Sequence, residues 1–188
     1  MKNKKTQILV ECAIMLGLAS ALSQIKFLQM PMGGSVTLMS LLPIALISIK
    51  RGVKVGIPVA FLFAIITFAL SRFEVFAWGL TPIALIGSLL LDYTLSPTVL
   101  GLSGMFRHKG IKGQLTGITM AVFLIFMCHF VSGILIFGQF ADGRTPFMHS
   151  LLYNGSYLLP ELGMTLVGAT FLLKTPQVRK MFSPAEIF

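Results

Sequence analysis

The sequence predicts an all-α integral membrane protein in which six transmembrane helices form one bundle. Of its 188 residues, 55% are hydrophobic and only 11% are charged. The mean hydropathy of +0.88 is higher than a soluble domain needs to fill its core. The length accommodates six spans of roughly 20 residues with their loops and leaves no room for a second domain. We therefore expect a single membrane domain over residues 1–188.

The apolar stretches place the spans at about residues 7–27, 38–49, 55–70, 76–102, 115–137 and 151–173. The first stretch begins as a signal peptide does, with lysines followed by an apolar run. However, Glu11 interrupts that run, which continues to Phe27 and is long enough to cross a bilayer. We therefore assign it to the first transmembrane helix.

Small residues recur on this first helix. Ala13, Gly17 and Ala21 are spaced by four residues, so they lie on one face, where they let another helix approach closely in lipid. The neighbouring helix belongs either to the same bundle or to a partner protein, and the spacing alone fits both.

Proline and glycine mark the interruptions between helices. Pro31 and the Gly33–Gly34 pair break any helix across residues 29–37, which predicts either an ordinary loop or a flap over a cavity. The fourth span contains Pro82 and Pro97, so we expect a kinked or broken helix there.

The basic residues predict the orientation in the membrane. With six spans and a cytoplasmic N-terminus, Lys26, Arg72 and Arg144 face outward and the other twelve of the 15 lysines and arginines face inward. This bias strongly favours a multi-pass protein of the cell membrane with both termini in the cytoplasm. The net charge of +9 is therefore distributed between the spans, which argues against nucleic acid as a partner.

Polar side chains concentrate around the last outer loop. They lie on two helix faces, with His129, Gly133 and Phe137 before the loop and His149, Tyr153 and Asn154 after it. Unsatisfied polar groups in hydrocarbon cost on the order of several kcal/mol each, so these faces should line a cavity rather than contact lipid. The orientation given above opens that cavity toward the exterior.

Asp92, which lies within the fourth span beside Tyr93, is the most informative single residue. A carboxylate inside a span is expensive unless it is paired, protonated or in contact with water, and such residues are functional candidates by default. No lysine or arginine is placed within a span, so a cationic ligand could be its partner. The alternative is solvation at a helix break or a bond to a neighbouring tyrosine or histidine. Together with the polar and aromatic residues above, Asp92 indicates a pocket for a flat, positively charged, nitrogen-rich molecule.

The sequence contains none of the common catalytic motifs. There is no GxxxxGKS/T phosphate loop, so the chain does not hydrolyse ATP in that manner, and there is no GxSxG or HExxH motif. The separation of His129 and His149 is not a recognised metal-ligand spacing. We therefore expect no catalytic residue, no metal and no cofactor. A membrane enzyme that uses His129 and Asp92 as an acid–base pair is the remote alternative.

Five stretches together resemble one known family. They are MPMGGSVTLMSLLPI (residues 30–44), RGVKVG (51–56), LLDY (90–93), HFVSGILIFGQFADG (129–143) and HSLLYNGSY (149–157). In this order they are similar to the thiamine-specific S components, which are the substrate-binding subunits of bacterial energy-coupling factor (ECF) vitamin transporters. The resemblance covers nearly the whole chain. It implies a six-helix bundle of the ECF S-component type that captures thiamine outside the cell and docks on a module of one transmembrane coupling protein and two ATPases.

The resemblance also implies roles for individual residues. The substrate-binding set is Asp92, Tyr93, His129, Gly133, Phe137, His149, Tyr153 and Asn154. Asp92 would balance the positive charge of the ligand, and Tyr93 and Phe137 would flank its rings. The two histidines of the set, together with the asparagine, would hydrogen-bond the aminopyrimidine. The small-residue stripe formed by Ala13, Gly17 and Ala21 would meet the coupling protein.

Three positions depart from the pocket typical of this family. The chain has Asp92 in place of a glutamate, Phe137 in place of a tryptophan and His149 in place of a tyrosine. These changes keep the pocket compatible with thiamine but bear on affinity and on selectivity against thiamine precursors. The alternative within transport is therefore an S component for another small vitamin or for a pyrimidine such as hydroxymethylpyrimidine.

Overall fold

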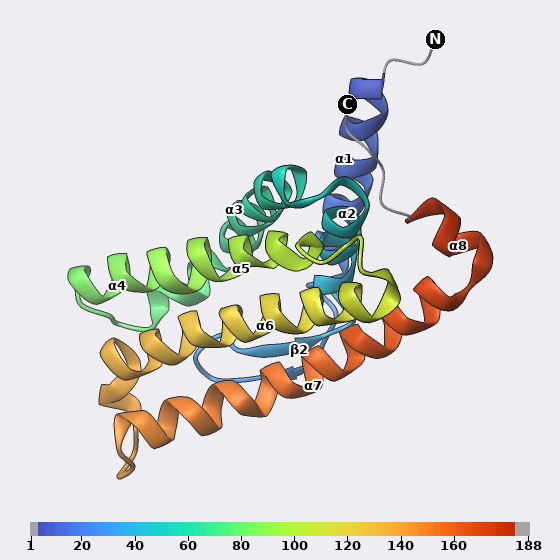
Figure 1. Cartoon of the computed structure of the whole chain (residues 1–188). Helices are drawn as coiled ribbons and strands as arrows, with labels where there is room; N and C mark the ends of the chain where they lie inside the picture. The colour runs from blue at the N-terminus through green and yellow to red at the C-terminus, as the bar shows by residue number, and fades with distance from the viewer. Residues whose placement is uncertain (1–3, 183–188) are drawn as a thin grey trace.

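The computed structural model describes residues 4–182 and consists almost entirely of helices (Figure 1). In chain order its elements are α1 (Lys4–Leu22), β1 (Lys26–Gln29), β2 (Ser35–Thr37), α2 (Leu41–Arg51), α3 (Val53–Ala77), α4 (Pro82–Ser88), the π-helix η1 (Leu89–Leu95), α5 (Ser96–Val99), the 3₁₀-helix η2 (Leu100–Gly104), α6 (Gly110–Leu135), the 3₁₀-helix η3 (Phe137–Phe140), α7 (Pro146–Lys174) and α8 (Pro176–Met181). The predicted all-α membrane class is confirmed, with one two-stranded hairpin added to it.

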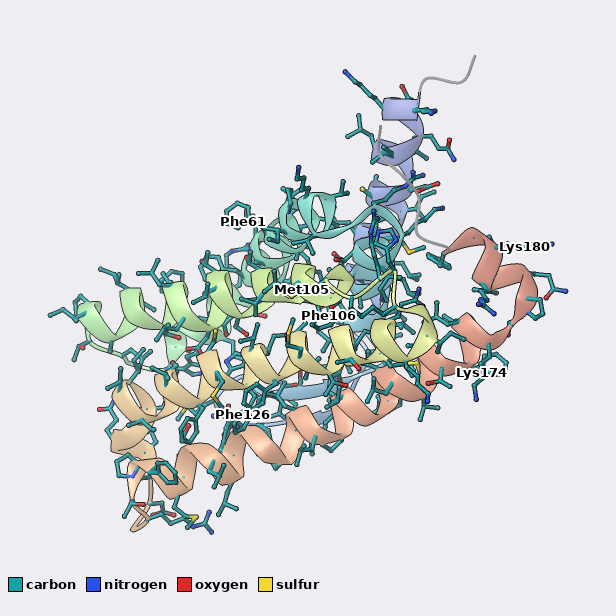
Figure 2. All side chains as sticks on the ribbon, viewed as in Figure 1. Phe61, Met105, Phe106, Phe126, Lys174 and Lys180 are labelled. Atoms are coloured by element: carbon teal, nitrogen blue, oxygen red, sulfur yellow. The ribbon has the colours of Figure 1, made fainter. Side chains whose placement is uncertain are left out.

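Within residues 4–182, five helical segments are long and apolar enough to cross a membrane. They are α1, α3, the combined segment Pro82–Gly104, α6 and α7. The largest shift from the predicted boundaries among these five is in α3, which continues to Ala77 and so includes Arg72, a residue predicted to lie outside the spans. Figure 2 shows the apolar Phe61 of α3 pointing away from the bundle, while Lys174 and Lys180 lie toward the C-terminus. This distribution suits a bundle surrounded by lipid.

α2 is the exception among the six predicted spans. Its 11 residues extend only about 16 Å, whereas the hydrocarbon core of a bilayer is about 30 Å thick. α2 is instead buried among the longer helices, and Lys50 and Arg51 at its C-terminal end pair with Glu11 in the first half of α1. The helix predicted over 38–49 is therefore found as α2, which is too short to cross a bilayer alone and whose C-terminal end lies beside the first half of α1.

A β-hairpin (residues 26–37) replaces the loop predicted over 29–37 and the end of the first predicted span. α1 ends at Leu22, and β1 then pairs antiparallel with β2. Backbone groups at membrane depth need hydrogen-bond partners, and the hairpin supplies them between its own strands. Gly33 near its tip has a φ of +88°, which a residue with a side chain rarely adopts. Of the two alternatives left open by the sequence, the flap over a cavity agrees with this arrangement.

The segment Pro82–Gly104 changes helix type where Asp92 and Tyr93 lie. α4 gives way to the π-helix η1, and α5 follows from Ser96. Pro97 has no N–H to donate to the carbonyl of Tyr93, and its ring would clash with that carbonyl, so a regular α-helix cannot continue through this point. The wider π turn accommodates the proline, and such turns occur frequently at functional sites. This agrees with the kinked or broken helix expected here.

α6 and α7 run side by side and carry most of the polar residues singled out above (Figure 1). The hydroxyl of Thr145 caps α7 by accepting the Met148 N–H at 3.2 Å. Pro160 lies inside α7 without ending it. Gly133 allows the two helices to approach closely, because a Cβ at this position would collide with the hydroxyl of Ser150.

α1 projects from the side of the bundle (Figure 1), and most of its side chains are exposed. Ala13, Gly17 and Ala21 all belong to this exposed surface. In the described part of the chain, no atom would lie within 4 Å of a Cβ added at Gly17. The stripe therefore does not pack within its own bundle, which was one of the two alternatives for it.

Candidate ligand-binding site

A cavity of about 230 Å³ lies between the hairpin, α3, the segment Pro82–Gly104, α6 and α7. All eight residues of the predicted substrate-binding set line it: Asp92, Tyr93, His129, Gly133, Phe137, His149, Tyr153 and Asn154. Pockets for drug-sized ligands usually enclose about 300–1,000 Å³, so this cavity suits a smaller molecule.

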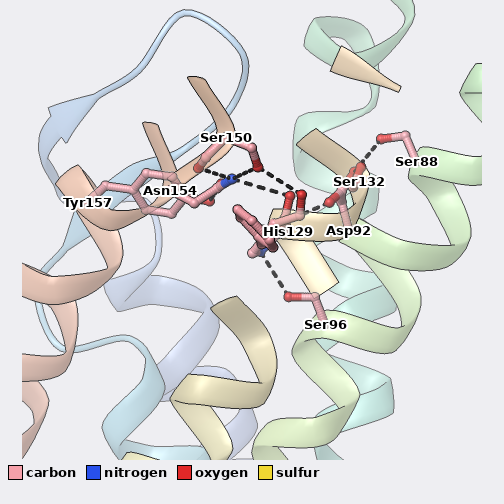
Figure 3. Close-up of polar contacts among 9 residues, drawn as sticks. Ser88, Asp92, Ser96, His129, Ser132, Ser150, Asn154 and Tyr157 are labelled. Carbon is pink, nitrogen blue, oxygen red and sulfur yellow. Dashed lines mark hydrogen bonds and ion pairs between the residues drawn. The ribbon is translucent and has the colours of Figure 1, made fainter. Parts of the chain in front are cut away.

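Asp92 is the centre of a hydrogen-bond network (Figure 3). Its Oδ1 accepts a hydrogen bond from Nδ1 of His129 at 2.8 Å. Its Oδ2 accepts the hydroxyls of Ser132 at 2.6 Å and Ser88 at 2.8 Å. The other nitrogen of the imidazole, Nε2, lies 2.9 Å from the hydroxyl of Ser96. The bond to a neighbouring histidine is one of the alternatives that the sequence left open for Asp92.

With a neutral imidazole this network leaves a negative charge at the cavity. In that case Nδ1 of His129 donates to Asp92 and Nε2 accepts the Ser96 hydroxyl. The three donors to the carboxylate are then uncharged, and within residues 4–182 no lysine or arginine forms an ion pair with Asp92. The Asp92 side chain is only 11% exposed, so a cation in the cavity would interact with it where solvent screening is weak.

Asn154 already uses most of its hydrogen-bonding capacity within the protein. Its amide nitrogen donates to the backbone carbonyls of His129 at 3.2 Å and Ser150 at 2.9 Å, and its side-chain oxygen accepts the Tyr157 hydroxyl at 2.9 Å. The residue therefore joins α6 to α7 at the cavity wall (Figure 3). What it can still offer a ligand is the second lone pair of its side-chain oxygen.

Trp78 extends an aromatic wall that Tyr93 and Phe137 form close to Asp92. Its ring centroid lies 6.3 Å from that of Tyr93 and 5.6 Å from that of Phe137. Aromatic faces attract cations, and tryptophan does so most strongly. Trp78 was not in the predicted binding set. Within residues 4–182 its buried indole N–H has no hydrogen-bond partner.

His149 and Tyr153 line the cavity from α7. Their rings stack with centroids 5.7 Å apart. The hydroxyl of Tyr153 accepts the backbone N–H of Met32, at the tip of the hairpin, at 2.9 Å. Among the described residues the imidazole of His149 has this ring contact and no hydrogen bond, so both of its nitrogens are available to a ligand.

The hairpin brings into the site residues that the sequence did not single out, although a flap over a cavity was one of the two alternatives for residues 29–37. Met32, Gly33, Gly34 and Thr37 all line the cavity, and so does Glu161 of α7. Proline and glycine did signal a break in this stretch. However, strands of three and four residues are too short to show the alternating pattern by which a strand is recognised.

The fold and the cavity together define a class of protein. Four of the five segments long and apolar enough to cross a membrane surround, with the hairpin, a cavity that combines a carboxylate, aromatic rings and an imidazole. In the part of the chain that the structure describes, no group of three His, Cys, Asp or Glu side chains is placed to hold a metal ion. This is a multi-pass membrane protein built to bind a small organic ligand.

Comparison with known proteins identifies the family. The thiamine transporter protein family matches residues 9–181 of the chain. The thiamine transporter ThiT of Bacillus subtilis is 33% identical over 189 residues, which cover 93% of this chain and 94% of that protein. The thiamine transporter ThiT of Lacticaseibacillus paracasei is 26% identical, with 92% and 89% covered. The chain therefore belongs to the thiamine transporter family.

A solved structure of ThiT from Listeria monocytogenes has the same fold. It matches with a TM-score of 0.75 at 24% identity, over 97% of this chain and 100% of that one. The resemblance found in the sequence motifs is thus confirmed, as is the choice of a transport protein over an enzyme.

Proposed function

We propose that this protein is the S component of an ECF transporter and captures thiamine outside the cell for ATP-driven uptake. The observation that carries the proposal is the Asp92 network, whose negative charge lies beside an aromatic wall within the cavity. Thiamine has a permanently cationic thiazolium ring joined to a neutral aminopyrimidine. A carboxylate and aromatic rings are the groups that recognise such a cation.

The contacts support a division of the proposed binding residues into two groups. Asp92 balances the thiazolium charge, while Tyr93 and Phe137 contact the ligand rings. His149 supplies a hydrogen bond to the aminopyrimidine, because its nitrogens have no other partner among the described residues. The remaining four residues of the set act mainly by holding these in place: His129, Gly133, Tyr153 and Asn154.

We further propose that α1 binds the coupling protein and that both termini are cytoplasmic. The exposed stripe around Gly17 has no neighbour in the described chain, which suits a contact with another helix. Lys50 pairs with Glu11 near the N-terminal end and lies 5.8 Å from the ring of Phe182 near the C-terminal end. Glu11 and Phe182, near the two ends of the described chain, therefore lie beside the same basic residue, which suits the cytoplasmic side.

Calorimetric titration of the purified, ligand-free protein tests the proposal. Thiamine, hydroxymethylpyrimidine and riboflavin are titrated separately, with riboflavin as the control vitamin. One-to-one binding of thiamine, tighter than that of the other two, is the expected result. If the protein bound hydroxymethylpyrimidine more tightly than thiamine, its ligand would be the pyrimidine precursor instead. Conversion of thiamine during the titration would instead support the enzyme alternative.

Docking through α1 is tested by Gly17→Leu. A leucine on the stripe prevents close approach of a partner helix, so we expect co-purification with the coupling protein and the ATPases to fall at least about tenfold. Thiamine binding should not change, because α1 contributes no residue around Gly17 to the cavity. Gly163→Leu is the matched control, since Gly163 is also exposed on a helix with open space around it. Equal co-purification of the two variants would contradict the docking proposal.

A further inference from the structure

Glu161 is a buried carboxylate to which the proposed function assigns no role. It is only 3% exposed and lies on the cavity side of α7. Its Oε2 accepts the backbone N–H of Thr37 at 2.6 Å, and its Oε1 accepts the hydroxyl of Thr37 at 2.8 Å. Within residues 4–182 Glu161 forms no ion pair. When ionised, its carboxylate is therefore stabilised by two donors that belong to one residue.

Thr37 is the last residue of the hairpin. It pairs with Lys26 across the two strands, and its hydroxyl also lies 2.7 Å from that of Ser40, just before α2. The Thr37–Glu161 pair thus fixes the foot of the hairpin to α7. The tip is fixed to the same helix by the bond between Met32 and Tyr153.

One face of α7 carries much of the attachment of the hairpin, which also bonds α3 through Gln29 and Glu74. Tyr153, Tyr157 and Glu161 are spaced by four residues and so lie on one side of the helix. The middle residue also contacts the hairpin, because a Cβ added at Gly34 would lie 2.5 Å from the ring of Tyr157. The hairpin therefore rests on α7 along its length, and its two ends are held there by hydrogen bonds.

We infer that Glu161 is a positioning residue that, through Thr37, holds the hairpin over the cavity and thereby sets the rates at which ligand binds and leaves. This inference rests on the proposed function. If the hairpin lifts away from α7, the carboxylate loses both donors at once. A buried ion without partners is strongly unfavourable, so the open state requires water to reach Glu161 and is rare while Thr37 and Glu161 are paired.

The test is stopped-flow fluorescence of the purified full chain mixed with thiamine. Trp78 is the only tryptophan, it lines the cavity, and a Cβ added at Gly33 in the hairpin would lie 2.8 Å from its ring. Its emission therefore reports both ligand binding and movement of the hairpin. Association and dissociation rates are measured for the unmodified protein, Thr37→Val, Glu161→Gln and the double variant.

Thr37→Val removes the bonds of the hydroxyl to Glu161 and Ser40 and keeps the side-chain shape and the backbone N–H. The expected result is a dissociation rate raised roughly tenfold, as for the loss of one hydrogen bond to a charged group. The association rate should also rise, by several-fold, because the open state becomes more populated. Thr119→Val is the matched control, since Thr119 is exposed on α6 and bonds only its own helix.

The double variant separates a joint action from two independent ones. If Thr37 and Glu161 act as a pair, the fold-increase in dissociation rate of the double variant should be well below the product of the fold-increases of the two single variants. If Thr37→Val and Glu161→Gln showed the same rates as Thr119→Val, the inference would be overturned. Thiamine binding by the unmodified protein would still support the proposed function. A faster dissociation with unchanged association would also overturn the inference, because that pattern indicates a lost ligand contact. If Thr37→Val does not fold, Glu161→Gln alone gives the same two readouts.

Discussion

Asp92 and Glu161 are both carboxylates within membrane-crossing helices, and neither pairs with a lysine or arginine in the described part of the chain. They differ in where their hydrogen-bond donors lie. Asp92 accepts bonds from Ser88 of α4 and from His129 and Ser132 of α6. Glu161 accepts both of its bonds from Thr37 of the hairpin. One carboxylate is held by packed helices, and the other holds a flap.

This difference shows how two buried carboxylates that line the same cavity can serve different purposes. Donors on packed helices keep Asp92 in place whether or not a ligand is present, so its carboxylate remains available to a cation. The donors to Glu161 leave together when the hairpin moves, so its stabilisation depends on the closed state. The comparison therefore predicts that Asp92 determines which ligand binds and that Glu161 determines how fast it binds.

The largest expected effect comes from Asp92→Asn. An amide of nearly the same shape cannot balance the thiazolium charge, and loss of one partner of a buried charge pair costs at least about 3 kcal/mol, or on the order of 100-fold in Kd. Calorimetric titration with thiamine measures it. Glu161→Gln should weaken equilibrium binding far less, because it changes both rate constants in the same direction. Equal losses of affinity in the two variants would contradict the different roles assigned to Asp92 and Glu161.

A neutral ligand makes this comparison sharper. Hydroxymethylpyrimidine lacks the thiazolium ring, so Asp92→Asn should change its Kd by less than about threefold, the size of a weak hydrogen-bond effect. The same calorimetric titration, with both ligands and both proteins, measures the difference. A similar loss for the neutral and the cationic ligand would mean that the substitution disturbs the cavity rather than removing a charge that thiamine needs.

The part of the site that sequence reasoning reached is the part that depends on single helices. Helical spacing placed His129, Gly133 and Phe137 on one face, and the cost of a carboxylate in a span singled out Asp92. All four line the cavity. These inferences need only the chemistry of one residue and the period of its own helix.

The part that it did not reach depends on contacts between elements. The serines that bond Asp92 and His129 are common residues whose role appears only when two helices pack together. Asn154 lines the cavity, but the sequence did not indicate that its amide also joins α6 to α7. The pairing of Thr37 with Glu161 spans 124 positions, and no local pattern connects residues so far apart.

Ser132→Ala tests whether the position of Asp92 depends on the packed helices that hold it. The substitution removes the shortest of the three bonds to the carboxylate and leaves those from His129 and Ser88. We expect thiamine affinity to fall roughly tenfold, the value of one hydrogen bond to a charged group. Ser156→Ala is the control, because Ser156 is exposed and bonds its own helix backbone. If affinity were unaffected, two donors would suffice to hold Asp92 in place.

The smallest effect is expected from Tyr153→Phe, which releases the tip of the hairpin and leaves its foot attached. The variant loses the bond from the N–H of Met32 but keeps the ring that stacks on His149. The lost bond joins uncharged groups at a part-buried position, where water can replace the hydroxyl, so its contribution is about 0.5–1 kcal/mol. Stopped-flow measurement should therefore show a dissociation rate raised by only about two- to fivefold. The decisive observation is which of the two hairpin variants, Tyr153→Phe or Thr37→Val, dissociates thiamine faster. If Tyr153→Phe accelerated dissociation more than Thr37→Val does, the tip would be the main attachment, and the buried charge of Glu161 would not control the flap.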